Sequence, residues 1–145
     1  MNEVEVFQEN MLLIRRCLGW TASDLGDRIG VTRQTVNNLE SNRPEKYKLS
    51  RTQYLAMRYI LDEEIRKHPK ETEMVQTLLE ILIDNPESVS DEERRKVIEK
   101  ANMFAPSILA KTATREEVSD EWMGLLGLGV LGAAVAAIAA AILKK

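Results

Sequence analysis

Hydrophobic residues recur every three or four positions along most of this chain, which is the spacing of amphipathic helices. No run of residues alternates between apolar and polar with a period of two, so no strand is predicted. Glycine and proline breaks, together with Ser and Thr caps, divide the pattern into separate helices. These signals predict helices over Val4–Leu18, Ala22–Ile29, Arg33–Ser41, Arg51–Arg66, Glu71–Ile83 and from Ser90 through Ala101. The sequence therefore predicts an all-α protein.

The pattern after residue 101 predicts a break followed by one last helix. Ala105 and Pro106 are expected to interrupt the preceding helix, because proline lacks the backbone donor that a helix interior needs. Thr114 and Glu117 have the spacing of a capping box, which opens a helix. That helix could run without a break into the C-terminal tail.

Residues 20–43, WTASDLGDRIGVTRQTVNNLESNR, have the spacing of two short helices that cross at a tight turn. Gly26 allows the two helices to approach closely, and Gly30 permits the positive φ that a tight turn needs. The exposed face of the second helix then has donors and acceptors and no carboxylate: Thr32, Arg33, Gln34, Thr35, Asn37 and Asn38. Such a face suits the major groove of DNA, which presents mixed donors and acceptors between two lines of phosphates.

The same segment resembles the Cro/repressor-type (lambda-repressor-like, or Xre) helix-turn-helix family over about residues 6–66. The matching positions are Thr21, Leu25, Gly26, Gly30, Val31, Thr32, Val36 and Glu40. The resemblance implies a compact helical bundle whose third helix enters the major groove of double-stranded DNA, usually on a two-fold operator.

By position, the resemblance also assigns roles to individual side chains. It implies base contacts by Arg33, Gln34, Thr35 and Asn38, and phosphate contacts by Thr32, Asn37, Arg43, Lys46 and Lys48. Two positions depart from the family: Ala22 replaces a glutamine that often binds phosphate, and Asn42 replaces the usual glycine after the recognition helix. The first departure removes one phosphate contact, and the second changes little, because asparagine tolerates the same backbone region.

Charge is distributed unevenly along the chain. Between Arg15 and Arg58 there are nine basic and four acidic residues, a net charge of +5. Residues 71–121 hold six basic and 13 acidic residues, a net charge of −7. This asymmetry favours an anionic partner for the N-terminal part.

The C-terminal tail is strongly apolar. Met123–Leu143 contains 21 residues without a charge, and a continuous helix of that length spans roughly 31 Å, close to the thickness of a bilayer's hydrocarbon core. Trp122 at one end, with Lys144 and Lys145 at the other, fits interfacial anchors. The tail is therefore predicted to be a single transmembrane helix, and burial in the core of a soluble oligomer is the alternative.

Small residues recur every fourth position along this tail, at Gly129, Ala133 and Ala137. Small side chains permit close contact between helices in lipid, so these three residues are predicted to pack the tail against another helix.

The rest of the composition argues against catalysis. The chain has one cysteine, Cys17, and one histidine, His68, too few for a disulfide framework, a Cys or His zinc site, or a Cys–His or Ser–His catalytic pair. No carboxylate pair or glycine loop has the context of an active site. The acidic, polar N-terminus is not a signal peptide. We therefore expect no enzyme activity, no metal site and no cofactor.

Together these features predict three parts: a DNA-binding head over residues 1–68, an acidic helical linker or interaction region over residues 69–121, and a transmembrane tail over residues 122–145. The predicted function is a transcription regulator tethered to the cytoplasmic membrane, with its head in the cytoplasm. Its expected partners are double-stranded DNA, membrane lipid and further copies of itself, as a homodimer or higher homo-oligomer.

Two alternatives stay open. One is a membrane-active effector, in which the Gly/Ala tail oligomerises and the head restrains it. The other is a soluble, oligomeric, helical interaction protein.

Overall fold

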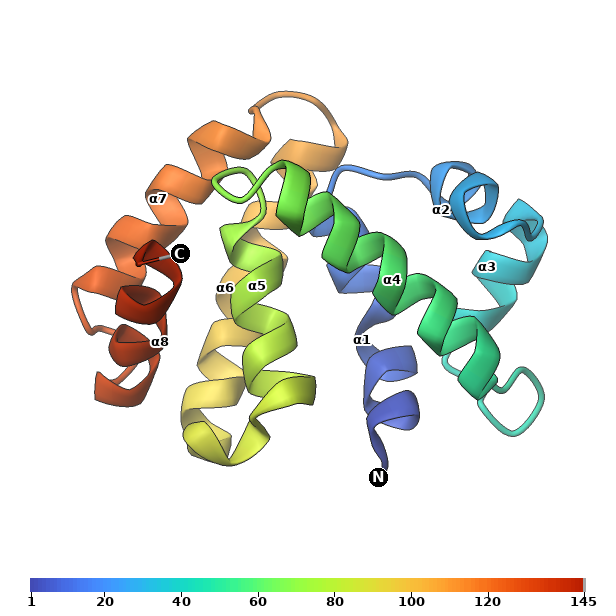
Figure 1. The fold of residues 1–145 in the computed structure, drawn as a ribbon, viewed down its shortest axis with the longest axis horizontal. Helices are drawn as coiled ribbons and strands as arrows, with labels where there is room; N and C mark the ends of the chain where they lie inside the picture. The colour runs from blue at the N-terminus through green and yellow to red at the C-terminus, as the bar shows by residue number, and fades with distance from the viewer. Residues whose placement is uncertain (145) are drawn as a thin grey trace.

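The computed structural model describes residues 1–144, and the prediction of an all-α protein is confirmed, because no strand occurs in this range. Figure 1 shows α2 and α3 at one end, α7 and α8 at the other, and α1, α5 and α6 between them. The α-helices are α1 (Glu3–Cys17), α2 (Ala22–Ile29), α3 (Arg33–Leu39), α4 (Arg51–Lys67), α5 (Glu73–Leu79), α6 (Asp91–Leu109), α7 (Arg115–Gly127) and α8 (Ala133–Leu143). A π-helical turn, η1 (Glu80–Asp84), continues α5, and a 3₁₀ turn, η2 (Pro86–Ser88), follows it.

Local capping fixes where most of these helices begin. In five of them a Ser or Thr side chain accepts the backbone N–H three residues ahead: Thr21, Thr32, Ser50, Ser90 and Thr114. At four of the five, the residue three ahead reaches back to the cap's own N–H, which completes a capping box. These caps satisfy donors that the first turn of a helix would otherwise leave without partners.

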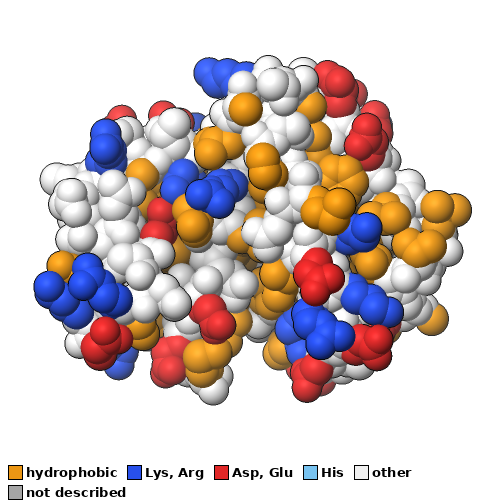
Figure 2. Space-filling model, turned by 180° about the vertical axis from the view of Figure 1, so that it is seen from behind, with side chains coloured by type: hydrophobic (Ala, Val, Ile, Leu, Met, Phe, Trp, Pro, Cys, Tyr) orange, Lys and Arg blue, Asp and Glu red, His pale blue; other side chains and the backbone are white. Residues whose placement is uncertain are grey.

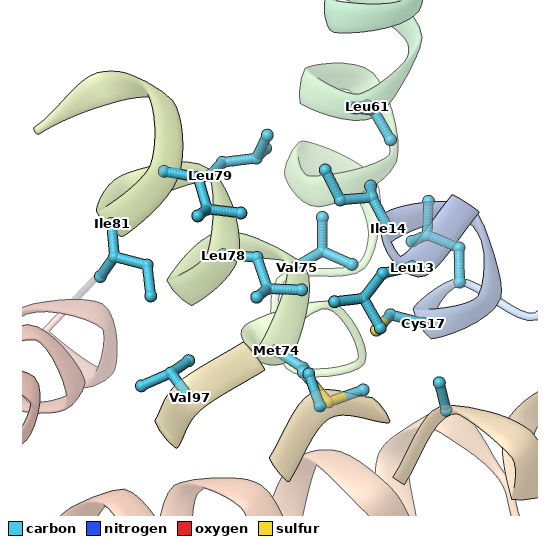
Figure 3. Packing of buried hydrophobic residues seen from close by; sticks show 14 of the residues in the cluster. Leu13, Ile14, Cys17, Leu61, Met74, Val75, Leu78, Leu79, Ile81 and Val97 are labelled. Carbon is cyan, nitrogen blue, oxygen red and sulfur yellow. The ribbon is translucent and has the colours of Figure 1, made fainter. Parts of the chain in front are cut away.

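One hydrophobic core runs through the whole molecule. In Figure 3, side chains of α1 (Leu13, Ile14), α4 (Leu61) and α5 (Val75, Leu78) face one another. The same cluster continues from α1 into α7 and α8. The N-terminal head is therefore packed directly against the residues that follow it.

The tail differs from the sequence prediction. Trp122, expected at a membrane interface, is completely buried, and its indole N–H donates to the Thr77 hydroxyl of α5 at 3.2 Å. Helix α7 ends at Gly127, and Gly129 and Gly132 take positive φ values of 71° and 115°. Such values favour glycine and end the helix, so the chain turns back at this point.

After the turn, α8 packs against α5 and α7 and buries one face, formed by Val135, Ile138, Ala139 and Ile142. Within residues 1–144, no helix is both long and apolar enough to cross a membrane. The predicted transmembrane helix is wrong, because the apolar run is divided between two antiparallel helices. The predicted single-pass location in the cytoplasmic membrane is wrong for the same reason, and contact with membrane lipid loses its basis.

The small residues of the tail do not form one row on one helix. Gly129 lies in the turn, while Ala133 and Ala137 are exposed on α8. Lys144 follows α8 as its C-cap, and Lys145, predicted with it as an anchor, lies outside the described residues.

Candidate nucleic-acid interface

Two glycines and one threonine cap hold helices α2 and α3 at a close crossing. Gly30 ends α2 in the left-handed region, at φ 78°, and Thr32 then caps α3. Gly26 lies so close to the turn that a Cβ built there would be 2.6 Å from the Val31 carbonyl oxygen. The structure therefore requires glycine at position 26 for this approach.

The start of α2 carries a fixed negative charge. Asp24 accepts a hydrogen bond from the Thr21 backbone N–H at 2.8 Å, and this bond holds the pKa of the Asp24 carboxyl below its ordinary value. The Thr21 hydroxyl in turn accepts the Asp24 N–H, so the capping box at the start of α2 includes a carboxylate.

The two faces of α3 have different roles. Val36 and Leu39 are buried and attach the helix to the core. The predicted base-contacting residues all reach the surface: Arg33 and Gln34 are exposed, and Thr35 and Asn38 are partly exposed. Of the predicted phosphate contacts, Thr32 and Asn37 are exposed at this helix too. Positions 33, 34, 37 and 38 share one side of a helix, opposite the buried residues.

Hydrogen bonds order this exposed face. The Gln34 side-chain amide donates to the Asn38 side-chain oxygen at 2.9 Å, which leaves the Gln34 carbonyl and both Asn38 amide hydrogens for another partner. The Thr32 and Thr35 hydroxyls lie 3.0 Å apart. Amide side chains arranged in this way can hydrogen-bond base edges in a major groove.

The loop after α3 presents exposed cations. Arg43, Lys46 and Lys48 are all exposed. The Arg43 guanidinium and the Lys46 ammonium lie 5.6 Å and 5.2 Å from the centre of the Tyr47 ring. Figure 2 shows Lys and Arg side chains at the end of the molecule that carries α3 and this loop, and others at the opposite end, with Asp and Glu side chains beside both. The structure thus places the predicted phosphate contacts beside the polar face of α3.

Gln8 of α1 fixes the loop's path. Its side-chain amide donates to the carbonyls of Leu39 (3.1 Å) and Tyr47 (2.6 Å), and its side-chain oxygen accepts the Leu49 N–H at 2.9 Å. One side chain therefore joins both ends of the loop to α1.

Sequence reasoning missed a buried ion pair beneath the interface. Arg15 of α1 donates to both carboxylate oxygens of Glu40, each at 2.8 Å, and to the Trp20 carbonyl at 2.9 Å. Only 9% of the Arg15 side chain and 5% of the Glu40 side chain are exposed. Glu40 belonged to the family pattern, but its partner lies 25 residues away and has no local signal. The pair holds the end of α3 against α1.

Comparison with known proteins agrees with this geometry. A helix-turn-helix family model matches residues 13–50, which confirms the predicted helix-turn-helix over that segment, about a quarter of the chain. No curated protein and no solved structure matches the chain.

Proposed function

We propose that this protein is a sequence-specific regulator of transcription that binds double-stranded DNA through α3 and has no enzymatic role. The observation that carries the proposal is the exposed face of α3, which is polar, free of carboxylates and adjacent to a basic loop. The helix-turn-helix match over residues 13–50 supports it, because units of this type place their second helix in the major groove.

In this proposal, Arg33, Gln34, Thr35 and Asn38 contact bases and determine sequence preference. Thr32, Asn37 and the loop cations contact phosphates and supply affinity that is independent of sequence. The Gln34–Asn38 hydrogen bond holds two base-reading amides in a fixed relation before DNA binds.

The test compares one proposed base contact, Gln34, with one proposed phosphate contact, Lys46. Gln34→Ala should cost about 1–3 kcal/mol on the preferred site and relax sequence preference, because a base-edge contact is lost. Lys46→Ala should weaken all sequences alike and lower the salt slope by about one, because one phosphate contact is lost. Selection of binding sites from random DNA measures the sequence preference of each variant. Titrations with DNA at several salt concentrations measure its affinity and the salt dependence of that affinity.

Arg95→Ala is the control, since Arg95 is an exposed cation on α6, outside the head. If Gln34→Ala has the same affinity and sequence preference as the Arg95→Ala control, α3 is not the helix that contacts the bases.

We further propose that two copies act together, as a two-fold operator requires. Support comes from α8, which has no polar side chain between Ala133 and Leu143 and buries only one face. Leu143, the last residue of α8, is 68% exposed. Leu128 and Val130, in the turn before α8, are 76% and 56% exposed. The same observation favours the second candidate function, an oligomeric helical interaction protein that does not bind DNA.

Sedimentation and DNA titration of Ala137→Glu together separate the two candidates. A charge on the exposed face of α8 should shift the protein toward monomer, whereas Asn102→Glu, at an exposed position of α6, should not. Self-association without DNA binding supports the second candidate, and a wild-type protein that stays monomeric at all concentrations contradicts the role of α8.

A further inference from the structure

An open groove of about 680 Å³ lies between the first half of α1 and the loop after α3. Its apolar lining includes Leu12, Leu39 and Pro44, and the carboxylates of Glu5, Glu9 and Glu45 line it too. The size is typical of sites that hold small organic molecules, which are commonly about 300–1,000 Å³ and mostly apolar with a few polar groups.

The charge of this groove is predominantly negative. Glu40 also lines it, but its carboxylate is neutralised by Arg15. Glu5, Glu9 and Glu45 take part in no ion pair within residues 1–144, and Lys48 is the one cationic side chain in the lining. An apolar surface therefore lies beside three carboxylates that only one cationic side chain opposes.

We propose that this groove binds an amphiphilic organic cation, a small molecule with an apolar body and a single positive charge. The apolar body removes Leu12 and Pro44 from water, which is the main source of affinity in such sites, and packs against the already buried Leu39. The carboxylates attract the positive charge and repel an anion of the same shape, so charge determines the selectivity.

Two residues make the groove well defined in shape. Gln8 lines it and fixes both ends of the loop to α1, and Glu40 is fixed by its ion pair with Arg15. A site that is already ordered loses less conformational entropy on binding. The groove contains none of the proposed base-reading residues and shares only Lys48 with the proposed phosphate contacts, so its occupation can be measured without DNA.

The experiment uses the full chain and two ions of the same shape and opposite charge, tetraphenylphosphonium and tetraphenylborate. Isothermal titration calorimetry should detect the phosphonium and find the borate much weaker. Glu5→Gln with Glu9→Gln should weaken phosphonium binding by about three- to tenfold, as expected for two partly solvated charges. The effect should shrink as salt is added, because salt screens exposed charges.

The matched control is Glu116→Gln with Glu121→Gln, which removes the same charge from exposed positions of α7 and should leave binding unchanged. A second variant, Leu12→Ala, should weaken binding by shrinking the apolar lining. Circular dichroism spectra and melting temperatures establish that each variant is folded.

The proposal is overturned if neither ion binds, if both bind equally, or if the paired Glu5 and Glu9 substitutions lower the phosphonium affinity no more than the α7 control does. Weaker DNA binding with intact phosphonium binding would instead concern the proposed function alone.

Discussion

Removing both partners of the Arg15–Glu40 pair should destabilise the fold much less than the sum of the two single removals. In Glu40→Ala the Arg15 guanidinium stays buried with only the Trp20 carbonyl as a hydrogen-bond partner. In Arg15→Ala the carboxylate of Glu40 loses both of its 2.8 Å hydrogen bonds. Each single change leaves an unpaired charge in a site where less than a tenth of either side chain is exposed.

The magnitude follows from that burial. Breaking a buried pair by removing one partner costs about 3–5 kcal/mol, whereas removing the second partner as well adds little, because no unpaired charge then remains. The double variant Arg15→Ala with Glu40→Ala should therefore be more stable than the sum of the single effects predicts, by at least about 2 kcal/mol.

Urea denaturation, followed by circular dichroism, measures all four proteins of this double-mutant cycle. The control cycle is Lys96 with Glu92, an i,i+4 pair on α6 whose side chains are 45% and 67% exposed, and its coupling should not exceed about 0.5 kcal/mol. If the Arg15–Glu40 coupling is as small as the control's, the pair does not lock α3 to α1 and this reasoning fails.

Three further changes test other parts of the structure. Gly26→Ala should lower the free energy of unfolding by about 1–3 kcal/mol, measured in urea, because the new methyl group meets the Val31 carbonyl. Glu73→Gln should raise stability at pH 7. Burial, and secondarily Asp120, raises the pKa of Glu73 above 4.5, so its charged form disfavours folding. The gain should vanish well below pH 4.5, and a gain independent of pH would contradict this. Trp122→Ala should cost about 3–5 kcal/mol in the same urea assay, since the side chain is fully buried, and a loss below about 1 kcal/mol would mean that α7 does not pack on the core.

The sequence predicts the ends of a helix correctly where the residues that determine them are adjacent in the sequence. α2 begins and ends where predicted, at Ala22 and Ile29, because a capping box and a left-handed glycine lie next to its ends. The prediction for α3 extended it to Ser41, but the helix ends at Leu39. Its last turn is followed by Glu40, whose side chain is held by Arg15 of α1, and that distant contact left no local signal.

Pro106 was expected to interrupt α6, yet the helix continues through it to Leu109. Proline removes the hydrogen bond to the carbonyl four residues earlier, which belongs to Asn102. Asn102 is exposed, so water can satisfy that carbonyl. Meanwhile Ala105 and Ile108, on either side of the proline, are buried in the core, and their packing favours a continued helix.

The turn between α7 and α8 contacts a residue that lies outside the tail, Glu93 of α6. The N-cap position of α8, Gly132, has no side chain to accept a hydrogen bond. The carboxylate of Glu93, at the start of α6, lies directly beside Gly132. Hydrogen bonds with Ser90 hold the pKa of the Glu93 carboxyl below its ordinary value, so the group that faces Gly132 is a carboxylate. A Cβ at Gly132 would collide with that carboxylate, so glycine is needed for the contact as well as for the backbone angle.

The average hydrophobicity of Met123–Leu143 depends only on which residues are present. It therefore cannot show where a helix ends within the segment. The run includes Gly129 and Gly132, which turn the chain, and the helices on either side are 13 and 11 residues long. A continuous helix would carry Val135, Ile138 and Ile142 away from the core, where α8 now buries them against α5 and α7. The arrangement of the tail is therefore determined in part by residues of α5 and α6, more than 25 positions before it, which its own composition cannot reveal.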